Sequence, residues 1–311
     1  MASDPMGKGA ASILERLHCV DCGGKLEALR CVACDRQYEA PSGIPALFQL
    51  EDMESDTFHR YEVNYERIAT DDLEKDIVPR QFRCAQAEKL ARYCGGHLKG
   101  RVLDVGSGQG DFLSQVPHDD KVALDIARAY LLRLAERGWT CIQANAERLP
   151  FEEEFDLIVS TDVLEHVLDE RRAMESLARA LNVRGRVVIR VPLNEDLSKY
   201  DPAAGCPYEF VHLRTFNEET LTTVVEEAGL RVVRLAYDGF SVGQTRKAPR
   251  SRRPIDWMVW GIGRVVSRVL LRVLRNQTRT DALIAQLPER LGVRIFVPIT
   301  LTIVAEKPPS V

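Results

Sequence analysis

Hydrophobic residues fall in two kinds of segment, short runs that are mostly apolar and stretches in which apolar residues return at helical spacing. Five apolar runs predict buried strands, near residues 101–105, 121–125, 140–144, 155–160 and 185–191. Helical spacing over 169–181 predicts a helix. A second helix is expected to begin at Asn217 as N-cap and to end at Gly229. Strands that alternate with helices predict an α/β fold with a parallel sheet covered on both faces.

Two further strands are expected towards the C-terminus, at about 230–238 and near 295–305, where β-branched residues dominate. About 55 residues lie between them, whereas ordinary connections are about 4–6 residues long. We therefore expect an insertion at about 240–294, containing a helix over 255–274. The other expected parts are a small N-terminal unit over 1–50, a helical linker over 51–100 and a main domain over 101–311.

Composition is that of an ordinary globular protein, with 45% hydrophobic and 28% charged residues in a chain of 311. These values exclude a wholly disordered chain, a collagen-like fibre and a disulfide-packed miniprotein. No secretory pattern and no uninterrupted apolar stretch of transmembrane length is present, so a cytoplasmic location is expected.

Charge is unevenly placed along the chain. The formal net charge is −4, but residues 246–279 carry +9, which leaves −13 on the remainder. The ten basic residues of this segment are Arg246, Lys247, Arg250, Arg252, Arg253, Arg264, Arg268, Arg272, Arg275 and Arg279. Three interpretations stay open, in falling order of preference: a lid or homodimer helix, a peripheral membrane contact through residues 255–275, and a grip for RNA.

Four of the eight cysteines form two C-x-x-C pairs, Cys19 with Cys22 and Cys31 with Cys34. Two such turns supply four thiolates, which suits tetrahedral Zn²⁺ and leaves no open position for a substrate. A structural zinc site is therefore predicted, and its binding energy would fold a segment too short to bury much core. The scattered cysteines are expected to be packing residues: Cys84, Cys94, Cys141 and Cys206.

The surroundings of these pairs resemble the Trm112-like zinc-ribbon family. The match runs from His18 to Phe48 and includes Tyr38, then Gly43-Ile44-Pro45 leading to Leu47. The resemblance implies a zinc ribbon ahead of the main domain.

A glycine loop follows the first strand of the main domain. Residues 101–113 read RVLDVGSGQGDFL, with a helix expected after the glycines. A dinucleotide loop of the G-x-G-x-x-G type would need glycine at 111, where this chain has Asp. Asp125 ends the next strand, about 20 residues after the loop begins, where an acid accepts hydrogen bonds from ribose hydroxyls. Acids at the loop disfavour a pyrophosphate and suit a zwitterionic ligand with a sulfonium.

The ordered set of segments over residues 80–240 resembles the class I S-adenosylmethionine (SAM)-dependent methyltransferases, close to the type 11 group. VLDVGSGQGDFL, ALDIARAYL, ANAERLPF, FDLIVSTDVLEHV and GRVVIRVP resemble its successive motifs. The resemblance implies a Rossmann-like seven-stranded sheet whose last, antiparallel strand is inserted next to the sixth. It also implies a SAM site, with Asn145 where the family often has Asp. The implied cofactor-binding residues are Asp104, Gly106, Ser107, Gly108, Gly110, Asp125, Ile126, Asn145, Ala146, Glu147, Thr161 and Leu164.

Loops after the fourth and fifth strands are expected to hold the methyl acceptor, because ligands bind beyond the carboxyl ends of such strands. His166 and His212, with Asp162 nearby, are the candidate catalytic residues, and a histidine would act as general base on a hydroxyl. Asp162-x-x-Glu165-His166 with His212 is also similar to a metal-binding pattern of some quinone and small-RNA methyltransferases, which have Glu at the first position. A second divalent metal at Glu165, His166 and His212 is thus an alternative to simple structural bracing, which we favour.

The sequence therefore predicts a SAM-dependent methyltransferase that O-methylates a small molecule, a sugar or a lipid-linked glycan. The alternatives are an RNA methyltransferase that grips RNA with the ribbon and the basic helix, and a non-catalytic SAM-fold protein whose ribbon docks a partner.

Overall fold

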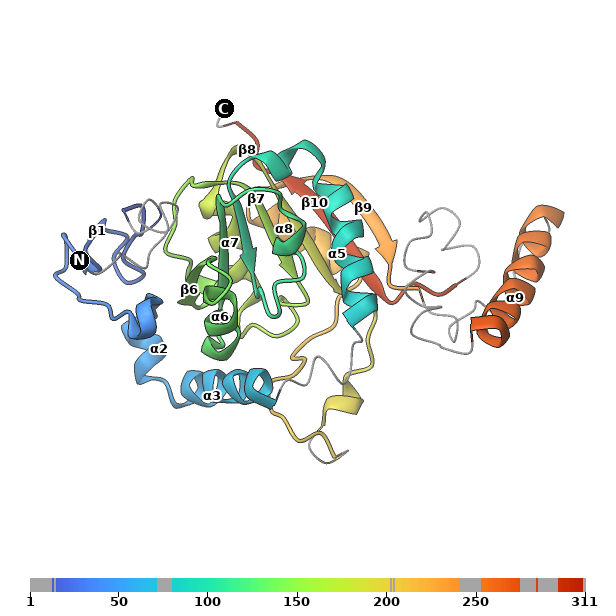
Figure 1. The fold of residues 1–311 in the computed structure, drawn as a ribbon, viewed down its shortest axis with the longest axis horizontal. Coiled ribbons are helices and arrows are strands. Elements are labelled where there is room, and N and C mark those ends of the chain that lie inside the picture. The colour runs from blue at the N-terminus through green and yellow to red at the C-terminus, as the bar shows by residue number, and fades with distance from the viewer. Residues whose placement is uncertain are drawn as a thin grey trace.

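The computed structural model describes residues 13, 15–71, 80–201, 203, 205–240, 253–274, 284 and 296–309. Its centre is an eight-stranded sheet (Figure 1). In spatial order the strands are β3 (Ala46–Leu47), β6 (Thr140–Ala144), β5 (Lys121–Asp125), β4 (Val102–Val105), β7 (Phe155–Thr161), β8 (Leu181–Pro192), β10 (Thr300–Glu306) and β9 (Arg231–Asp238). Of the basic segment 246–279, the structure describes Arg253 and α9 (Pro254–Leu274); the other basic residues of this segment lie outside the described residues.

Strands β3 to β8 run parallel, and β10 lies antiparallel between β8 and β9. This arrangement confirms the predicted inversion at the last strand. The strands β4 and β5 are buried at every position, as expected for parallel strands covered on both faces. Because the parallel strands share one direction, their carboxyl ends meet at a single edge, which we call the carboxyl edge.

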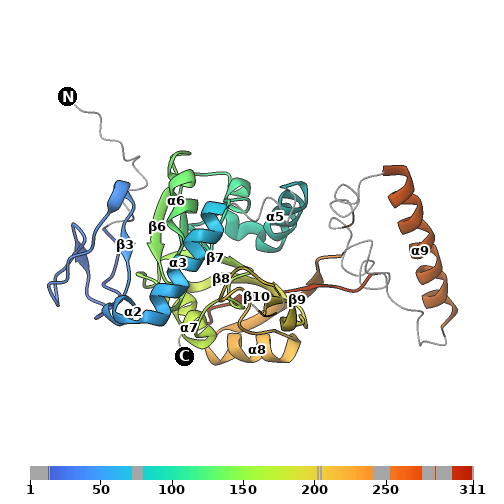
Figure 2. The ribbon, with the colours of Figure 1, turned by 90° about the horizontal axis from the view of Figure 1, so that it is seen from below.

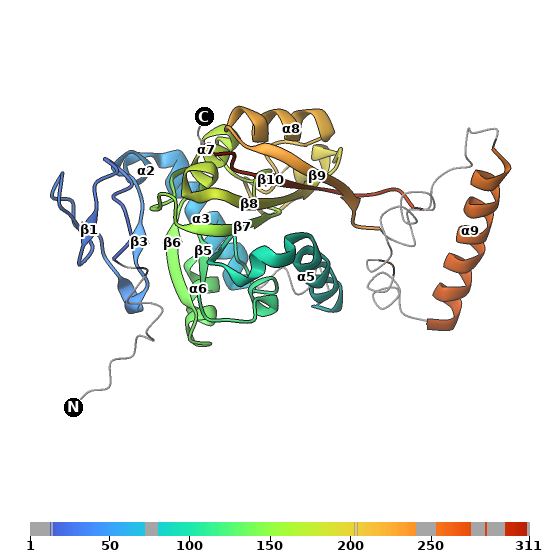
Figure 3. The same cartoon turned by 90° about the horizontal axis from the view of Figure 1, so that it is seen from above.

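Helices cover both faces of the sheet. α7 (Glu170–Ala180) and α8 (Glu218–Glu227) lie on one face, and α5 (Arg80–Cys94) and α6 (Arg128–Ala135) lie on the other (Figure 3). α8 begins at the predicted cap, because Asn217 and Thr220 form a capping box, and Gly229 follows its end at φ +80°. Short 3₁₀ turns join these elements: Pro41–Gly43, Gly95–Lys99, Leu113–Gln115, Ala146–Arg148 and Leu197–Tyr200.

One local prediction is wrong: no α-helix follows the glycine loop. The chain forms only the 3₁₀ turn Leu113–Gln115 before β5 begins at Lys121. The physical reason is the short distance to β5 together with Pro117, which has no N–H to continue a helix. A helix dipole therefore contributes nothing at this loop.

The N-terminal ribbon is built onto the sheet. It contains the hairpin β1 (Leu26–Glu27) and β2 (Arg30–Cys31) and continues through β3 into α2 (Leu50–Glu54) and α3 (Asp56–Asp71). β3 adds an eighth strand that the sequence did not predict, paired in parallel with β6 (Figure 2). Leu17 and Leu47 of the ribbon belong to the same hydrophobic cluster as Ile142 of the sheet.

α9 stands away from the sheet at one end of the molecule in all three ribbon views (Figures 1–3). Among the described helices, none combines the length and the apolar character needed to span a bilayer.

Candidate active site

The glycine loop Gly106–Gly110 lies at the carboxyl edge, directly after β4. Gly106 and Gly110 have φ of +72° and +74°, which side-chain-bearing residues adopt only with strain. A Cβ at Gly106 would lie 2.3 Å from Cγ2 of Val163, and one at Gly110 would lie 2.6 Å from the Trp139 ring. The loop therefore requires glycine at both positions, for conformation and for space.

Asp125 ends β5 beside this loop and is buried. Its carboxylate accepts hydrogen bonds from N–H of Gly108 and of Ala127, each at 2.9 Å. Burial raises the pKa of Asp125 to about 6, although these backbone donors lower it. Each carboxylate oxygen keeps a further lone pair, so the group can still accept from ribose hydroxyls as predicted.

Asp104 lies inside β4 and is 2% exposed. Burial and then the nearby Asp125 raise the pKa of its carboxyl well above the ordinary value. Ser107 is also buried, and its hydroxyl has no hydrogen-bond partner within the described structure. An unpaired buried hydroxyl in a glycine loop is the kind of group that a polar ligand satisfies, so the residues present fit a bound SAM.

Asn145 and Glu147 follow β6, and they differ in role. The Asn145 side chain accepts from N–H of Glu147 and donates to Asp52 of α2 at 3.2 Å. The Glu147 carboxylate accepts from N–H of Leu168 and Asp169, at 2.8 and 3.1 Å. Glu147 therefore braces the start of α7, whereas Asn145 links the cofactor edge to the segment that follows the ribbon.

The apolar wall of the cofactor edge comes partly from α3. Phe48, Phe58 and Tyr61 form a cluster against which Ile126 packs. The remaining residues predicted to bind SAM are distributed around the same edge: Ala146 begins the turn after β6, Thr161 ends β7, and Leu164 is buried in the following loop.

The candidate acceptor site joins the loops after β7 and β8. The rings of His166 and His212 pack edge to face with centroids 4.6 Å apart, and Tyr200 stacks on His212 at 4.2 Å. Nδ1 of His212 is hydrogen-bonded to Glu195. Burial acts to raise the pKa of Glu195, but hydrogen bonds from His212, Lys199 and Tyr200 outweigh it and lower the pKa to about 2.

Glu165 and His166 lie beside His212 in this site, Glu165 buried and His166 partly buried. Glu165 is 1% exposed, and neither of its carboxyl oxygens has a hydrogen-bond partner within the described structure. Burial, followed by the charge of Asp162, raises its pKa well above the ordinary value. Burial and the neighbouring His212 lower the pKa of His166 to about 3, so its imidazole is neutral near pH 7. One ligand atom from each of Glu165, His166 and His212 lies within 4.8 Å of the others.

Asp162 is placed differently from the two histidines. It directly follows β7, has φ of +56° and pairs with Arg190 of β8. Its carboxylate is therefore neutralised by a guanidinium, and it does not join the Glu165, His166 and His212 group.

Sequence reasoning missed Arg214. Its guanidinium donates to the backbone carbonyls of Leu164 and Leu168, at 2.9 and 3.0 Å, and pairs with Glu170 at 3.1 Å. It thus fastens the β7 loop, which carries Glu165 and His166, to the segment that carries His212. Its only sequence signal is its place two residues after His212.

The four paired cysteines converge, as predicted. Sγ of Cys19 lies 3.7 Å from that of Cys34, and Sγ of Cys22 lies 3.4 Å from that of Cys31. A tetrahedron with metal–sulfur bonds of ~2.3 Å has sulfur–sulfur edges of about 3.8 Å, so the cluster fits Zn²⁺. N–H groups of Cys34 and Ala33 lower the pKa of Cys31 to about 6, against the effect of burial. Each of the four scattered cysteines is a free thiol.

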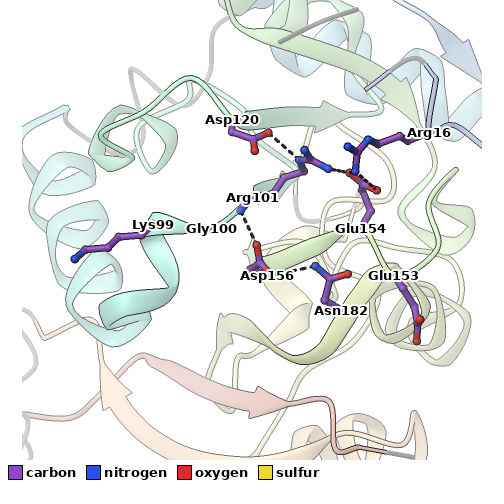
Figure 4. A pocket seen from close by; sticks show the side chains of 9 residues that line it. All are labelled: Arg16, Lys99, Gly100, Arg101, Asp120, Glu153, Glu154, Asp156 and Asn182. Atoms are coloured by element: carbon purple, nitrogen blue, oxygen red, sulfur yellow. Dashed lines mark hydrogen bonds and ion pairs between the residues drawn. The ribbon is translucent and has the colours of Figure 1, made fainter. Parts of the chain in front are cut away.

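A polar hollow of about 330 Å³ lies at the opposite, amino edge of the sheet (Figure 4). Arg16 and Arg101 both pair with Glu154 there, and Asp156 accepts from Asn182 at 3.0 Å. The pairing of Arg16 with Glu154 links the ribbon to the sheet. None of the candidate active-site residues lines this hollow.

Fold and site together define a class I SAM-dependent methyltransferase. A family model described as a methyltransferase domain matches residues 56–235, more than half of the chain. The chain therefore belongs to this methyltransferase family, and the predicted class is confirmed.

Curated relatives give the same class but different acceptors. A probable SAM-dependent methyltransferase of Mycobacterium tuberculosis is 25% identical over 63% of this chain and 66% of its own length. The tRNA (carboxymethyluridine(34)-5-O)-methyltransferase of Arabidopsis thaliana is 31% identical over 40% of this chain and 34% of its own. The ubiquinone/menaquinone biosynthesis C-methyltransferase of Yersinia enterocolitica is 31% identical over 49% of this chain and 66% of its own length. The chain spans less than two thirds of the length of each of these relatives.

Solved structures agree on the fold. One chain of the complex between the Haloferax volcanii Trm112 methyltransferase activator and a candidate methyltransferase superposes with a TM-score of 0.52 at 16% identity, covering 78% of this chain and 97% of that one. A possible histamine N-methyltransferase from Thermotoga maritima superposes with a TM-score of 0.51 at 16% identity, covering 78% of this chain and 98% of that one.

Proposed function

We propose that the protein transfers the methyl group of SAM to a hydroxyl of a small molecule, a sugar or a lipid-linked glycan, with His212 as general base. SAM, when bound, supplies an electrophilic methyl on a sulfonium, and the protein aligns the acceptor with it. The glycine loop, Asp125 and Asn145 would bind the cofactor, and the loops after β7 and β8 would hold the acceptor.

The observation that carries this proposal is the pairing of Glu195 with His212. Glu195 is ionised, because its pKa is about 2, so it can only accept, and Nδ1 of His212 must donate to it. In a neutral imidazole, Nε2 then keeps the lone pair that removes a proton. His166 has a pKa of about 3, which makes it a poor base and leaves it a packing role.

Release of S-adenosylhomocysteine from SAM tests the proposal, with phenolic, sugar and isoprenoid-linked glycan acceptors offered in turn. We expect turnover with one class and a decrease of about 10²–10⁴-fold in kcat for His212→Gln. The matched control is His59→Gln, on the exposed side of α3. Full activity of His212→Gln would contradict the role of base.

A second candidate is a divalent cation held by Glu165, His166 and His212. It is supported by the two unpartnered oxygens of Glu165 and by the neutral His166, because buried carboxylates are rarely left without partners. The Glu195 contact to Nδ1 is also the outer hydrogen bond that metal-ligating histidines usually make. Mn²⁺ titration followed by electron paramagnetic resonance would detect it. Glu165→Gln should abolish binding and Cys22→Ser should not.

RNA remains the alternative acceptor, and a curated relative from A. thaliana is a tRNA methyltransferase. Binding of a tRNA would then weaken steeply with salt, because released counterions drive it. Salt-independent or absent binding would remove this alternative.

The ribbon is a candidate internal support for the methyltransferase domain. It covers the edge strand β6 and shares its core with the sheet. In the Haloferax volcanii complex, Trm112 is a separate methyltransferase activator. We infer that this chain carries a comparable support within itself, and the zinc prediction in the Discussion tests it.

A further inference from the structure

α9 carries an exposed apolar stripe that the methyl-transfer site does not use. Its five residues are between 47% and 60% exposed and are spaced three, four, three and four positions apart. They are Ile255, Met258, Ile262, Val265 and Val269. This spacing puts them on one face of the helix, which at about 1.5 Å per residue is about 30 Å long.

The stripe has no extensive packing partner among the described helices and strands, and α9 stands clear of the sheet in each view (Figures 1 and 3). A large exposed apolar surface marks an interaction site. Trp257 and Trp260 form an edge-to-face pair with centroids 5.8 Å apart at the start of the helix. At about 100° per residue they lie on a different face of the helix from the stripe, so the stripe itself carries the inference.

Charge decides between the candidate occupants. The segment 246–279 carries +9, so pairing α9 with α9 of a second copy would bring like charges together. A nucleic acid would use the charge but gains nothing from five exposed apolar residues. An anionic bilayer surface uses both features, because apolar side chains enter the acyl boundary while cations meet the headgroups.

We propose that α9 docks the protein on membranes that contain anionic lipid, lying in the plane of the surface. The docking does not depend on the identity of the methyl acceptor. With the helix in the interface, the −13 remainder of the chain would be repelled from the same surface, which leaves α9 as the contact.

Vesicle flotation of the full chain tests the proposal, with phosphatidylcholine vesicles alone and with added phosphatidylglycerol. We expect flotation only with phosphatidylglycerol. The variant Ile262→Gln with Val265→Gln should bind at least about tenfold less, since it removes exposed apolar area. At about 1 kcal/mol for each cation near the surface, the triple variant Arg264→Gln, Arg268→Gln and Arg272→Gln should bind about a hundredfold less.

The matched control is Met53→Gln with Val63→Gln, two apolar residues of similar exposure on α2 and α3, which should float like the wild type. Thermal unfolding and S-adenosylhomocysteine binding show that each variant is folded, independently of turnover. The proposal is overturned by absent flotation, or by full flotation of the Ile262 and Val265 variant. Self-association or RNA binding without flotation would assign the stripe to a second copy or to a nucleic acid instead.

Discussion

Glu195 accepts a hydrogen bond from Nδ1 of His212, and both side chains are at most 15% exposed. The pair joins two ends of the loop that follows β8, and Tyr200 both donates to Glu195 at 2.8 Å and stacks on His212. The carboxylate thereby fixes which imidazole nitrogen carries the proton. This is the relationship on which the proposed chemistry depends.

Replacing Glu195 by Gln should lower kcat by about 10²-fold or more, because an amide can donate or accept and no longer fixes the tautomer of His212. KM for the acceptor should change little. Steady-state kinetics would show this split between kcat and KM. The comparison variant is Lys199→Met, which removes the half-exposed partner of Glu195 and should have a small effect, as surface ion pairs do. Equal losses in both variants would argue for a purely structural loop.

Binding of SAM should weaken as the pH falls below about 6. Burial raises the pKa of Asp125 to about 6, so its carboxylate, the form that accepts from ribose, disappears below that pH. From linkage, the dissociation constant should rise about tenfold between pH 7 and pH 5. Calorimetry at several pH values would measure it.

Asp125→Asn is the control for this pH dependence, since it should weaken binding at pH 7 and flatten the profile. The folding contribution of Asp125 has the opposite sign. A raised native pKa favours the fold at low pH, and this contribution is lost as the pH rises through about 6. A wild-type affinity that is constant from pH 7 to pH 5 would show that Asp125 does not contact the ligand.

Gly106→Ala should abolish SAM binding and lower the free energy of unfolding by about 1–3 kcal/mol, the usual cost of a strained backbone. The alanine would have to adopt φ of +72°, and its methyl group would lie 2.3 Å from Cγ2 of Val163. Adding Val163→Ala should recover only the part of the loss that is due to the clash. Gly96→Ala, whose added Cβ meets no atom within 4 Å, should be neutral. Denaturant unfolding and calorimetry separate the two effects.

Zinc should be present at one ion per chain, and its removal should weaken SAM binding. Sγ of Cys19 contacts the Tyr38 hydroxyl at 3.0 Å, and this hydroxyl donates to Asp21, whose other oxygen accepts from N–H of Leu50. Leu50 begins α2, which carries the Asp52 contact to Asn145 at the cofactor edge. Loss of the metal would therefore release α2 from the site.

Metal analysis of the purified chain and S-adenosylhomocysteine binding before and after chelation would measure both effects. Cys22→Ser should reproduce the chelated state, and Cys206→Ser, outside the cluster, should match the wild type. Unchanged cofactor affinity in a zinc-free, folded chain would separate the ribbon from the cofactor site.

The sequence predicted most of the fold, because burial on both faces leaves mostly apolar runs at β4, β5, β7 and β8. The prediction of a helix after the glycine loop was wrong, because Pro117 and the short connection to β5 limit the chain to a 3₁₀ turn. β3 was missed because two residues leave no periodic signal, and its pairing with β6 is a contact across about 100 residues of sequence.

By itself the sequence determined the chemistry available: four thiols in two C-x-x-C turns, a glycine loop with Asp125, and two histidines beyond parallel strands. These are local patterns, set by spacing along the chain. Only the tertiary structure decided which groups meet. It paired Asp162 with Arg190 and His212 with Glu195. It also left the Glu165 carboxyl without a hydrogen-bond partner among the described residues and placed Arg214 in contact with two loops. The reason is that burial and side-chain pairing depend on neighbours that are distant in sequence, and a pattern of residue types does not contain them.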